Sequence, residues 1–523
     1  MRYNKFIISQ TVLSVLTLPT VFGAKNVQKM NVLFIAVDDL KPEIGCYGNS
    51  LIKTPNIDRI GKNGTVFLQN YCQMAVSGPT RASLMTGMRP DYTKVWDLKT
   101  LMRDVNPDIL SLPQYFANQG YETTGVGKIY DPRCVDKDED KPSWTLPYNK
   151  VGTQYYSQST GQPMIGGYQL PETKLLIAKF VKEAKEQGLI GAKMIEYVQD
   201  RIKPSTECAD LPDDAYVDGA GVKRANELLT QLSKQDKPFF LAVGFAKPHL
   251  PFVAPKKYWD MYSRKEMPLA PFQEHAKNGP KIAYQNYELK SYSDIPAMCS
   301  FTDNPKNIGL NIDKQRELIH GYYAATSYMD AQLGKLLDKM EELGLTKNTI
   351  IVFWGDHGWH LGDHGLWCKH TNFEQATRAP LMIVAPGIKP VKTAGVSEFI
   401  DVFPTVCELA GLPIPTNLDG KSLVPLMKNS KAVVNEFAVS QYPREGNTMG
   451  YSIRSDRYRL TFWIKNDYHS NQPFSSDLVI AKELYDYQTD PLETVNVVDE
   501  KQYTAIRADL EGKMIVFFKT QQR

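Results

Sequence analysis

The sequence predicts an α/β protein in which a mixed, mostly parallel β-sheet is flanked by helices, with a smaller C-terminal α+β domain built on an antiparallel sheet. From residue 31 to about residue 390, short apolar runs alternate with helical patterns, which is typical of β-α-β units that cover both sheet faces. After about residue 431 the pattern changes to closely spaced strands and a terminal helix. Single cores stop growing at roughly 250–300 residues. We therefore expect the 523 residues to form an α/β domain at residues 24–430 and a subdomain at residues 431–523.

The parallel part of the sheet is predicted from four strands, three of which follow a predicted helix. Residues 31–37 (NVLFIAV) are continuously apolar, as in a parallel strand that is buried on both faces. Three later units each combine an amphipathic helix with an apolar strand. Their helices include residues 112–116, 222–232 and 322–340, and their strands lie at residues 121–126, 239–245 and 349–354. In the C-terminal subdomain we expect strands at residues 436–442, 449–454, 457–464 and 483–487 and a helix at about residues 503–518.

The composition is that of an ordinary globular protein, and it excludes several classes of partner. Hydrophobic residues make up 42% and charged residues 23%, and the formal net charge of +3 gives no support to binding of nucleic acid or of a membrane surface. The seven cysteines are too sparse for a disulfide scaffold or a zinc site, although one or two bridges are permitted. We expect a small or polymeric ligand held in a pocket, and the oligomeric state stays open.

Residues 1–23 predict a signal peptide. Arg2 and Lys5 precede an apolar stretch that is too short and too interrupted for a membrane span. Small residues at Val21 and Gly23 suit cleavage after Gly23. We therefore expect export, to the periplasm in a Gram-negative bacterium and otherwise by secretion.

Two long segments, residues 137–212 and 255–306, are rich in Pro, Tyr and Lys and show weak periodicity. Insertions of this kind usually form binding loops when they are not linkers. They are therefore candidate walls of a ligand site.

Polar residues follow all four of the predicted parallel strands, at the edge where α/β sheets hold their ligands. Each one alone could be a solvated loop charge, but four groups together on one rim indicate a site. In strand order they are Asp38 and Asp39, then Lys128, then Lys247 and His249, then Asp356 and His357.

The carboxylates in this set predict a metal site. Three carboxylates that converge would repel one another unless a cation lay among them. Asp38, Asp39 and Asp356 are hard oxygen ligands, which favours calcium, and magnesium after it, over zinc. In an alternative interpretation the Asp pair caps the following helix, which would explain Asp39 and leave Asp38 and Asp356 unpaired.

Residues 74–90 (MAVSGPTRASLMTGMRP) contain the most informative short pattern in the chain, Ser77-Gly78-Pro79-Thr80-Arg81. Taken alone, Ser-Gly-Pro could be a turn that leads into a helix, with Ser77 or Thr80 as its cap. The same five residues match Ser/Cys-x-Pro-x-Arg, the core of the type I sulfatase signature.

The chain resembles the type I sulfatases of the alkaline phosphatase superfamily, and within them it is most similar to the iduronate-2-sulfatase subgroup. The resemblance runs from Asn31 to Arg454. The matching stretches include NVLFIAVDDLKPEIGCYG, SGPTRASLMTGMRPD, VGKIYDP, FFLAVGFAKPHLPF and FWGDHGWHLGDHGLWCKHTNFE, and the last of these, with SQYPR and MGYSIR, carries the narrower match to the subgroup. The resemblance implies an alkaline-phosphatase-like fold and the hydrolysis of sulfate esters.

The resemblance also implies a role for each residue that matches a family motif. A formylglycine-generating maturation enzyme would oxidise Ser77 to formylglycine (3-oxoalanine), whose hydrate is the nucleophile. Arg81 would hold the modified side chain, Lys128 and Lys369 would bind the sulfate oxygens, and His249 would lie near the leaving oxygen. The implied calcium ligands are Asp38, Asp39, Asp356, His357 and an oxygen of residue 77.

The implied reaction has two steps. One hydroxyl of the hydrated aldehyde attacks sulfur while His249 or Lys369 protonates the sugar oxygen, and the other hydroxyl then loses its proton and collapses to the aldehyde with release of sulfate. Sulfatases commonly carry a His shortly after the lysine that corresponds to Lys128, as the base of the second step, whereas this chain has Tyr130 and Asp131. Asp131 is therefore a candidate base, although Asp-Pro is also an ordinary turn.

We expect a hydrolase that acts on sulfated oligosaccharides, at the 2-O-sulfate of iduronate or unsaturated uronate in heparan- or dermatan-type glycosaminoglycan fragments. Trp359 and Arg444 are further substrate-binding candidates. The candidate cationic partners of the uronate carboxylate are Lys247, His360, Arg444 and Arg454. Two alternatives stay open, namely a phosphodiesterase or phosphonate hydrolase of the same superfamily, and a glycan-binding protein with unmodified Ser77.

Overall fold

The computed structural model describes residues 29–285, 287–295, 310–470 and 473–521. The predicted signal peptide at residues 1–23 and Cys299 lie outside the described residues. The six cysteines among the described residues are free thiols. No helix in the described part of the chain is long and apolar enough to cross a membrane.

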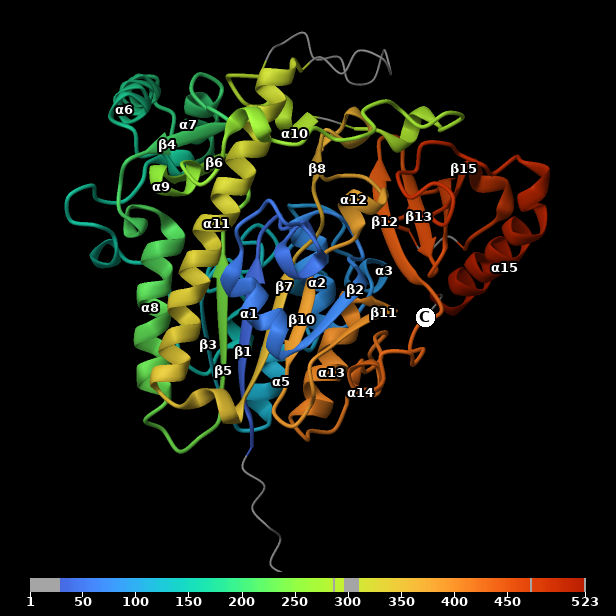
Figure 1. The fold of residues 1–523 in the computed structure, drawn as a ribbon, viewed down its shortest axis with the longest axis horizontal. Coiled ribbons are helices and arrows are strands. Elements are labelled where there is room, and N and C mark those ends of the chain that lie inside the picture. Colours follow the sequence, from blue (N-terminus) through green and yellow to red (C-terminus); the bar gives the residue numbers. More distant parts are fainter. Residues whose placement is uncertain (1–28, 286, 296–309, 471–472, 522–523) are drawn as a thin grey trace, which may run out of the picture.

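A seven-stranded sheet forms the centre of the molecule (Figure 1). Its strand order is β11-β2-β10-β7-β1-β5-β3. In chain order the strands are β1 (Asn31–Val37), β2 (Thr65–Tyr71), β3 (Glu122–Gly127), β5 (Phe239–Phe245), β7 (Thr349–Gly355), β10 (Leu381–Val384) and β11 (Val391–Glu398). The neighbours β3, β5, β1 and β7 run parallel, while β10 runs antiparallel to both β7 and β2. The predicted mixed, mostly parallel sheet is confirmed.

Helices cover both faces of this sheet because successive residues of each strand point to opposite sides. The alternate residues Leu33, Ile35 and Val37 of β1 pack with buried side chains of α1 (Pro55–Asn63), α8 (Val217–Leu232) and α11 (Ile312–Glu342). Val32 and Phe34 face the other way, onto α2 (Ser77–Thr86), α5 (Leu112–Asn118) and α13 (Val402–Leu409). Full burial of each large apolar side chain contributes about 1.5–3 kcal/mol, so β1 anchors both layers.

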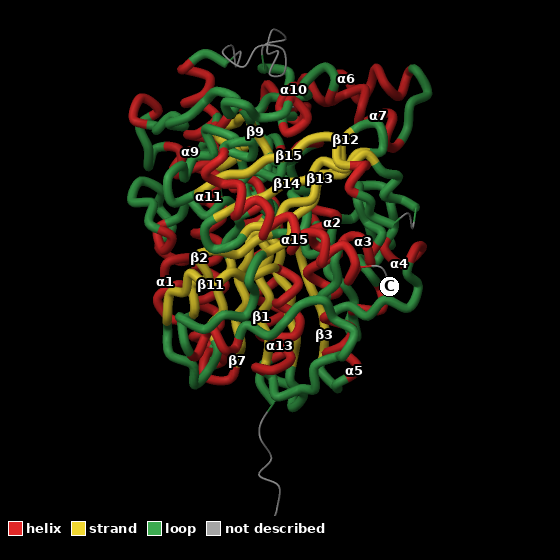
Figure 2. The backbone as a smooth tube through the Cα atoms, turned by 90° about the vertical axis from the view of Figure 1, so that its right-hand side faces the viewer, coloured by secondary structure: helices red, strands yellow, loops and turns green. Residues whose placement is uncertain are grey.

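The C-terminal part is an antiparallel sheet with one long helix, as predicted. Its strands are β12 (Ala438–Arg444), β13 (Thr448–Arg454), β14 (Tyr458–Lys465) and β15 (Val479–Asp486), paired in that order. Helix α15 (Thr504–Gln521) contacts β14 (Figure 2). Ile453, Leu460 and Met514 belong to the same apolar cluster as Val32 and Phe34, so the core is continuous between the two sheets.

The two long insertions contain more regular structure than their weak periodicity indicates. The first holds α6 (Pro171–Glu186), α7 (Gly191–Gln199) and β4 (Thr206–Ala209), and β4 pairs with β6 (Phe252–Pro255). The second holds α9 (Lys256–Trp259) and α10 (Tyr287–Lys290). Many residues of α6 and α7 are exposed, so an apolar stripe is hard to recognise in their sequence. Elements α6, α7 and β4 of the first insertion and α9 and α10 of the second lie beyond the carboxyl ends of the parallel strands (Figure 1).

The remaining short elements connect these units. They are α3 (Pro90–Thr93), α4 (Met102–Val105), β8 (His360–Leu361), β9 (Trp367–Cys368), α12 (Glu374–Thr377) and α14 (Val424–Lys428).

Candidate active site

The parallel strands bring the predicted site residues together at one edge of the sheet. In the register of β1 with its neighbours, Val37 lies beside Phe245 of β5 and Gly355 of β7, and Gly127 of β3 lies beside Gly244. The polar residues that follow these strands therefore meet. Asp38, Lys128 and His249 open onto a cavity of about 1060 Å³ whose lining also includes Ser77 and Lys369.

Ser77 and Arg81 lie one turn apart at the start of α2. Ser77 is 2% exposed, and its Oγ donates a hydrogen bond to Asp38 Oδ1 at 3.1 Å. The helix has no side-chain cap, and the Thr80 hydroxyl donates instead to the Asp356 carbonyl, so the capping interpretation of this motif is wrong. The first residue of a buried helix thus faces the carboxylate cluster.

Arg81 holds this cluster together. Its guanidinium is fully buried and donates to Asp38 Oδ1 and Asp356 Oδ2, each at 3.1 Å. It also donates to the carbonyls of Lys128 and Ile129 at 2.7 and 2.9 Å. One side chain therefore links the ends of β1, β3 and β7, as only the fork of an arginine can.

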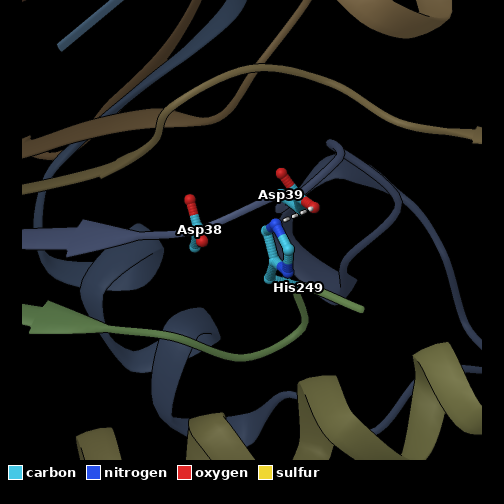
Figure 3. Close-up of side chains that lie close together, drawn as sticks. All are labelled: Asp38, Asp39 and His249. Atoms are coloured by element: carbon cyan, nitrogen blue, oxygen red, sulfur yellow. Dashed lines mark ion pairs between the residues drawn. The ribbon is translucent and has the colours of Figure 1, made fainter. Parts of the chain in front are cut away.

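The carboxylates lie close enough together to hold a cation. Ligand atoms of Asp39, Asp356 and His357 all lie within 4.8 Å of one another, as do those of Asp38, Asp39 and His249 (Figure 3). Burial, and then the charges of Asp38 and Asp356, raise the pKa of Asp39 well above its usual value, although Lys369 opposes them. Asp39 also holds a left-handed backbone with φ of 57°, which is uncommon outside glycine.

The surroundings of His357 show most clearly whether these residues fit a bound cation. Its Nδ1 lies 3.0 Å from the Gly358 carbonyl, so Nδ1 carries the proton and Nε2 offers a lone pair. Nε2 is buried, has no hydrogen-bond partner among the described residues, and lies 3.3 Å from Asp39 Oδ1 and 3.6 Å from Asp356 Oδ1. Burial lowers the pKa of His357 to about 4. A neutral nitrogen lone pair facing two carboxylate oxygens fits a divalent cation between them.

Two lysines flank the carboxylates. Lys128 Nζ lies 2.6 Å from Asp38 Oδ2. Lys369 Nζ lies 3.1 Å from Asp39 Oδ1 and rests over the Trp359 ring. Burial acts against the charged form of Lys369, but the charges of Asp39, Glu288 and Asp38 together outweigh it and raise the pKa. Both lysines line the cavity, where Lys369 is held as a cation.

His249 presents one defined nitrogen to the site. Its Nδ1 contacts the Leu250 carbonyl, which places the proton on Nδ1, and its Nε2 lies 3.7 Å from Asp39 Oδ2 (Figure 3). Burial, with the charge of Lys369 as the next cause, lowers the pKa of His249 to about 3. The ring is therefore neutral, with the Nε2 lone pair toward the other site residues.

Glu288 on α10 is a site residue that the sequence did not identify. Its Oε1 lies 3.2 Å from Lys369 Nζ, and its Oε2 lies 2.6 Å from His370 Nε2. The other ring nitrogen of His370 lies 2.6 Å from the Tyr442 hydroxyl. Burial acts to raise the pKa of Glu288, but the charges of Lys369 and His370 hold it well below its usual value. No motif marks this residue, because it lies in the weakly periodic insertion.

Four of the substrate-binding candidates lie away from the cavity lining. Trp359 is buried beneath Lys369. His360 is bonded to the Thr371 hydroxyl, Arg444 donates to the Ile282 and Ala283 carbonyls, and Arg454 pairs with Glu374 at 2.9 Å. Lys247 does line the cavity, but its Nζ donates to the His249 and Pro251 carbonyls. In the structure these side chains are therefore occupied by contacts within the protein.

Asp131 also lines the cavity, but its carboxylate is already bound. Both oxygens accept hydrogen bonds from the Arg133 side chain, at 2.9 and 2.8 Å. Burial acts to raise the pKa of Asp131, but these bonds and the charge of Lys128 lower it to about 2. A carboxylate with such a low pKa is a weak base.

Comparison with known proteins gives consistent matches over most of the chain. The family model described as Sulfatase matches residues 30–412, and the one described as N-sulphoglucosamine sulphohydrolase, C-terminal, matches residues 362–520. The iduronate 2-sulfatase of Mus musculus is 31% identical over 92% of this chain and 93% of the mouse protein. The iduronate 2-sulfatase of Homo sapiens is also 31% identical, over 90% of this chain and 92% of the human protein.

Solved structures share the fold at lower sequence identity. A phosphonate monoester hydrolase of Agrobacterium radiobacter aligns with a TM-score of 0.67 and 21% identity, covering 95% of this chain and 96% of its own. A 2-O GAG sulfatase aligns with a TM-score of 0.63 and 20% identity, covering 94% and 93%. Both solved structures share the overall architecture of this chain.

Proposed function

The chain belongs to the sulfatase family and is a sulfuric ester hydrolase, and we propose that it removes the 2-O-sulfate of iduronate or unsaturated uronate from heparan- or dermatan-type glycosaminoglycan fragments. The observation that supports the reaction is the position of Ser77, which lines the same cavity as Lys128 and Lys369 and is hydrogen-bonded to Asp38 of the carboxylate cluster. The similarity to two iduronate 2-sulfatases along nearly the whole chain supports the sugar. We further propose that residues 1–23 direct export.

Two groups complete this site. Conversion of Ser77 to formylglycine would supply, as its hydrate, a hydroxyl nucleophile for sulfur. A divalent cation, with calcium as our first choice, would be held by Asp38, Asp39, Asp356 and His357 and would supply positive charge for the sulfate oxygens. The carboxylate oxygens and the free His357 Nε2 fit both the charge and the ligand preference of such a cation.

The side chains of the site orient the substrate. Arg81 holds Asp38 and Asp356 in place from beneath residue 77. Lys128 and Lys369 approach from the ends of β3 and β9, so a sulfate group between them meets positive charge on two sides. These charges stabilise the negative charge that spreads over the sulfate as the S–O bond breaks.

We propose different roles for the two residues that could face the leaving oxygen. In the neutral ring of His249 the proton lies on Nδ1 against the Leu250 carbonyl, so Nε2 accepts a proton or a hydrogen bond. The charges of Asp39, Glu288 and Asp38 together outweigh burial and raise the pKa of Lys369, so its ammonium keeps its protons. We therefore assign to Lys369 a charged hydrogen bond to the leaving oxygen, and to His249 an acceptor role.

The test is hydrolysis by the matured protein. We expect turnover of an unsaturated 2-O-sulfated uronate–glucosamine disaccharide, and much slower turnover of a disaccharide that is sulfated only at the glucosamine 6-O position. Ser77→Ala is the matched control, because it removes only Oγ. Activity on the 6-O-sulfated disaccharide alone would contradict the assignment to uronate.

The rival activity is that of a phosphoryl or phosphonate hydrolase, favoured by the fold shared with a phosphonate monoester hydrolase. Turnover of an aryl phosphate that equals or exceeds that of the aryl sulfate would support it. The second rival, a glycan-binding protein, requires unmodified Ser77. Mass spectrometry of the peptide that contains residue 77 separates the two states, since formylglycine is about 2 Da lighter than serine.

A further inference from the structure

Lys369 lies in a short segment whose backbone has an uncommon conformation. It follows β9 directly, and its neighbours Cys368 and His370 both have left-handed backbones, with φ of 73° and 64°. Residues other than glycine keep this conformation only where surrounding contacts hold it. The position of the Lys369 ammonium therefore depends on the contacts of its own side chain and of His370.

Two carboxylates fix the direction of the Lys369 ammonium. Its Nζ lies 3.1 Å from Asp39 Oδ1 and 3.2 Å from Glu288 Oε1, and the centre of the Trp359 ring lies 4.9 Å away. An ammonium group has three N–H donors. The two carboxylates take two of them, which leaves the third for a substrate oxygen in the cavity that Lys369 lines.

Glu288 is held in turn by a buried histidine and a buried tyrosine. His370 Nε2 lies 2.6 Å from Glu288 Oε2, and His370 Nδ1 lies 2.6 Å from the Tyr442 hydroxyl. The Tyr287 ring stacks on His370 with 4.8 Å between ring centres, and its hydroxyl lies farther from Nδ1, at 3.5 Å. These contacts make one hydrogen-bond chain that ends at the reacting lysine and consists of Tyr442, His370, Glu288 and Lys369.

The hydrogen bonds of this chain all point toward Glu288. Burial raises the pKa of the Tyr442 hydroxyl well above its usual value, so the hydroxyl keeps its proton and donates a hydrogen bond to His370 Nδ1. Burial also lowers the pKa of His370, although Glu288 opposes it, so the neutral ring donates from Nε2 to Glu288. Without the Tyr442 hydroxyl, the ring proton would be free to move to Nδ1, and a lone pair would then face the carboxylate. The Tyr442 hydroxyl thus fixes the tautomer that holds Glu288.

Tyr442 belongs to the C-terminal subdomain, whereas the residues it supports do not. It lies on β12, while Glu288 lies on α10 and His370 follows β9. Glu288 and His370 line the cavity, and Tyr442 is outside its lining. The chain therefore connects the C-terminal sheet with the reacting end through two residues that the substrate can meet.

We propose that Tyr442 is a positioning residue, which acts through His370 and Glu288 to hold the Lys369 ammonium toward the leaving oxygen. The inference rests on the proposed function, in which Lys369 gives that oxygen a charged hydrogen bond. It adds that the C-terminal subdomain takes part in the chemistry. Because a poor leaving group carries more negative charge on its oxygen as the S–O bond breaks, the contribution of Lys369 is largest for poor leaving groups.

The test measures kcat/KM of the matured protein for a series of aryl sulfates, from nitrophenyl sulfate, with a good leaving group, to phenyl sulfate, with a poor one. Tyr442→Phe removes only the hydroxyl, and we expect it to lower kcat/KM about threefold for nitrophenyl sulfate and about tenfold for phenyl sulfate. His370→Asn removes the donor to Glu288 and should show the same pattern. His370→Gln, whose amide replaces Nε2 as a donor, should keep at least about a third of the wild-type kcat/KM for phenyl sulfate.

Tyr451→Phe is the matched control for the loss of a buried tyrosine hydroxyl. Tyr451 lies on the neighbouring strand β13, outside the cavity lining, and its hydroxyl donates to Asp91 at 2.8 Å. This variant should keep the wild-type dependence on the leaving group, even where its Tm falls as far as that of Tyr442→Phe. Equal losses for all aryl sulfates in Tyr442→Phe, or a steeper dependence in Tyr451→Phe as well, would overturn the inference.

Lys369→Met separates this inference from the proposed function. If its loss of kcat/KM is no greater for phenyl sulfate than for nitrophenyl sulfate, the assigned role of Lys369 is wrong, and the positioning role of Tyr442 with it. If its loss is greater for phenyl sulfate and that of Tyr442→Phe is not, only the positioning role is wrong. Aryl sulfates carry no sugar, so neither result depends on the assignment to uronate.

Discussion

Replacing Asp39 with asparagine is expected to change the stability of the protein in opposite directions with and without a divalent cation. Asp39 is fully buried, and its carboxylate lies within 4.8 Å of ligand atoms of both Asp38 and Asp356. Asparagine keeps the shape of the side chain and tolerates the left-handed backbone at this position. The substitution therefore changes charge and metal ligation, with little added strain.

The magnitude follows from the distances. At an effective dielectric constant of about 20, each carboxylate pair at this separation repels by about 3.5 kcal/mol, whereas Lys369 attracts Asp39 by about 5 kcal/mol. About 2 kcal/mol of repulsion remains, so Asp39→Asn should stabilise the cation-free protein by about that amount. A cation at a concentration of about 1,000 times its Kd stabilises wild type by about 4 kcal/mol. The variant should lose this stabilisation because it lacks one of the cation ligands.

The assay is thermal unfolding at pH 7 in EDTA and in 1 mM CaCl₂. One kcal/mol moves the Tm of a chain this long by about 1–2 °C. The variant should therefore unfold a few degrees above wild type in EDTA and a few degrees below wild type in calcium. Asp330→Asn is the matched control, because it alters a buried carboxylate of α11 outside the cluster and should keep the calcium shift. A variant that is less stable than wild type in EDTA and still responds to calcium would refute the reasoning.

Three further predictions concern single side chains. Glu288→Gln should lower kcat on the sulfated disaccharide about tenfold with little change in KM, because the ammonium of Lys369 loses one anionic anchor; a change in KM alone would contradict this. The pKa of Asp131 near 2 lies below its unfolded value near 3.9, so the stability it provides is present above about pH 4 and is lost as the pH falls toward 2. Asp131→Asn should therefore lower the Tm at pH 7 and leave the shape of the kcat profile between pH 5 and 9 unchanged, whereas a large fall in kcat at unchanged Tm would make Asp131 the base. Arg454→Met should cost about 1.5–3 kcal/mol by removing the ion pair from Glu374, which keeps its hydrogen bond from the Tyr71 hydroxyl, and this should be seen as a lower Tm at unchanged KM; a raised KM at unchanged Tm would place Arg454 in substrate binding instead.

Local patterns were enough to predict the reacting edge of the sheet. The continuously apolar run of β1 can only be a buried strand, and the two aspartates that follow it must emerge at its carboxyl end. The same logic located Lys128 after β3 and Asp356 after β7, because parallel neighbours end together. Ser77 and Arg81 were recognised from a motif whose spacing is one helical turn.

Contacts between distant segments could not be predicted in this way. Nothing local in the second insertion indicates that Glu288 reaches Lys369, 81 residues further along the chain. Arg444 could have faced solvent or substrate, and only the position of the Ile282 and Ala283 carbonyls decided that it is bound within the protein. Asp131 has the residue type of a base, but its bonds to Arg133 lower its pKa.

By itself, the sequence determined the four parallel strands β1, β3, β5 and β7, their order along the chain and the chemistry placed at their ends, because apolar runs and turns are set by neighbouring residues. The tertiary structure decided which charges are free to meet a substrate and which are already paired. It also decided the shape of the cavity beyond the reacting end, where Lys203 and Tyr292 come from different insertions. The pairing of charges and the shape of the cavity depend on how side chains from distant segments pack, so no local sequence pattern predicts them.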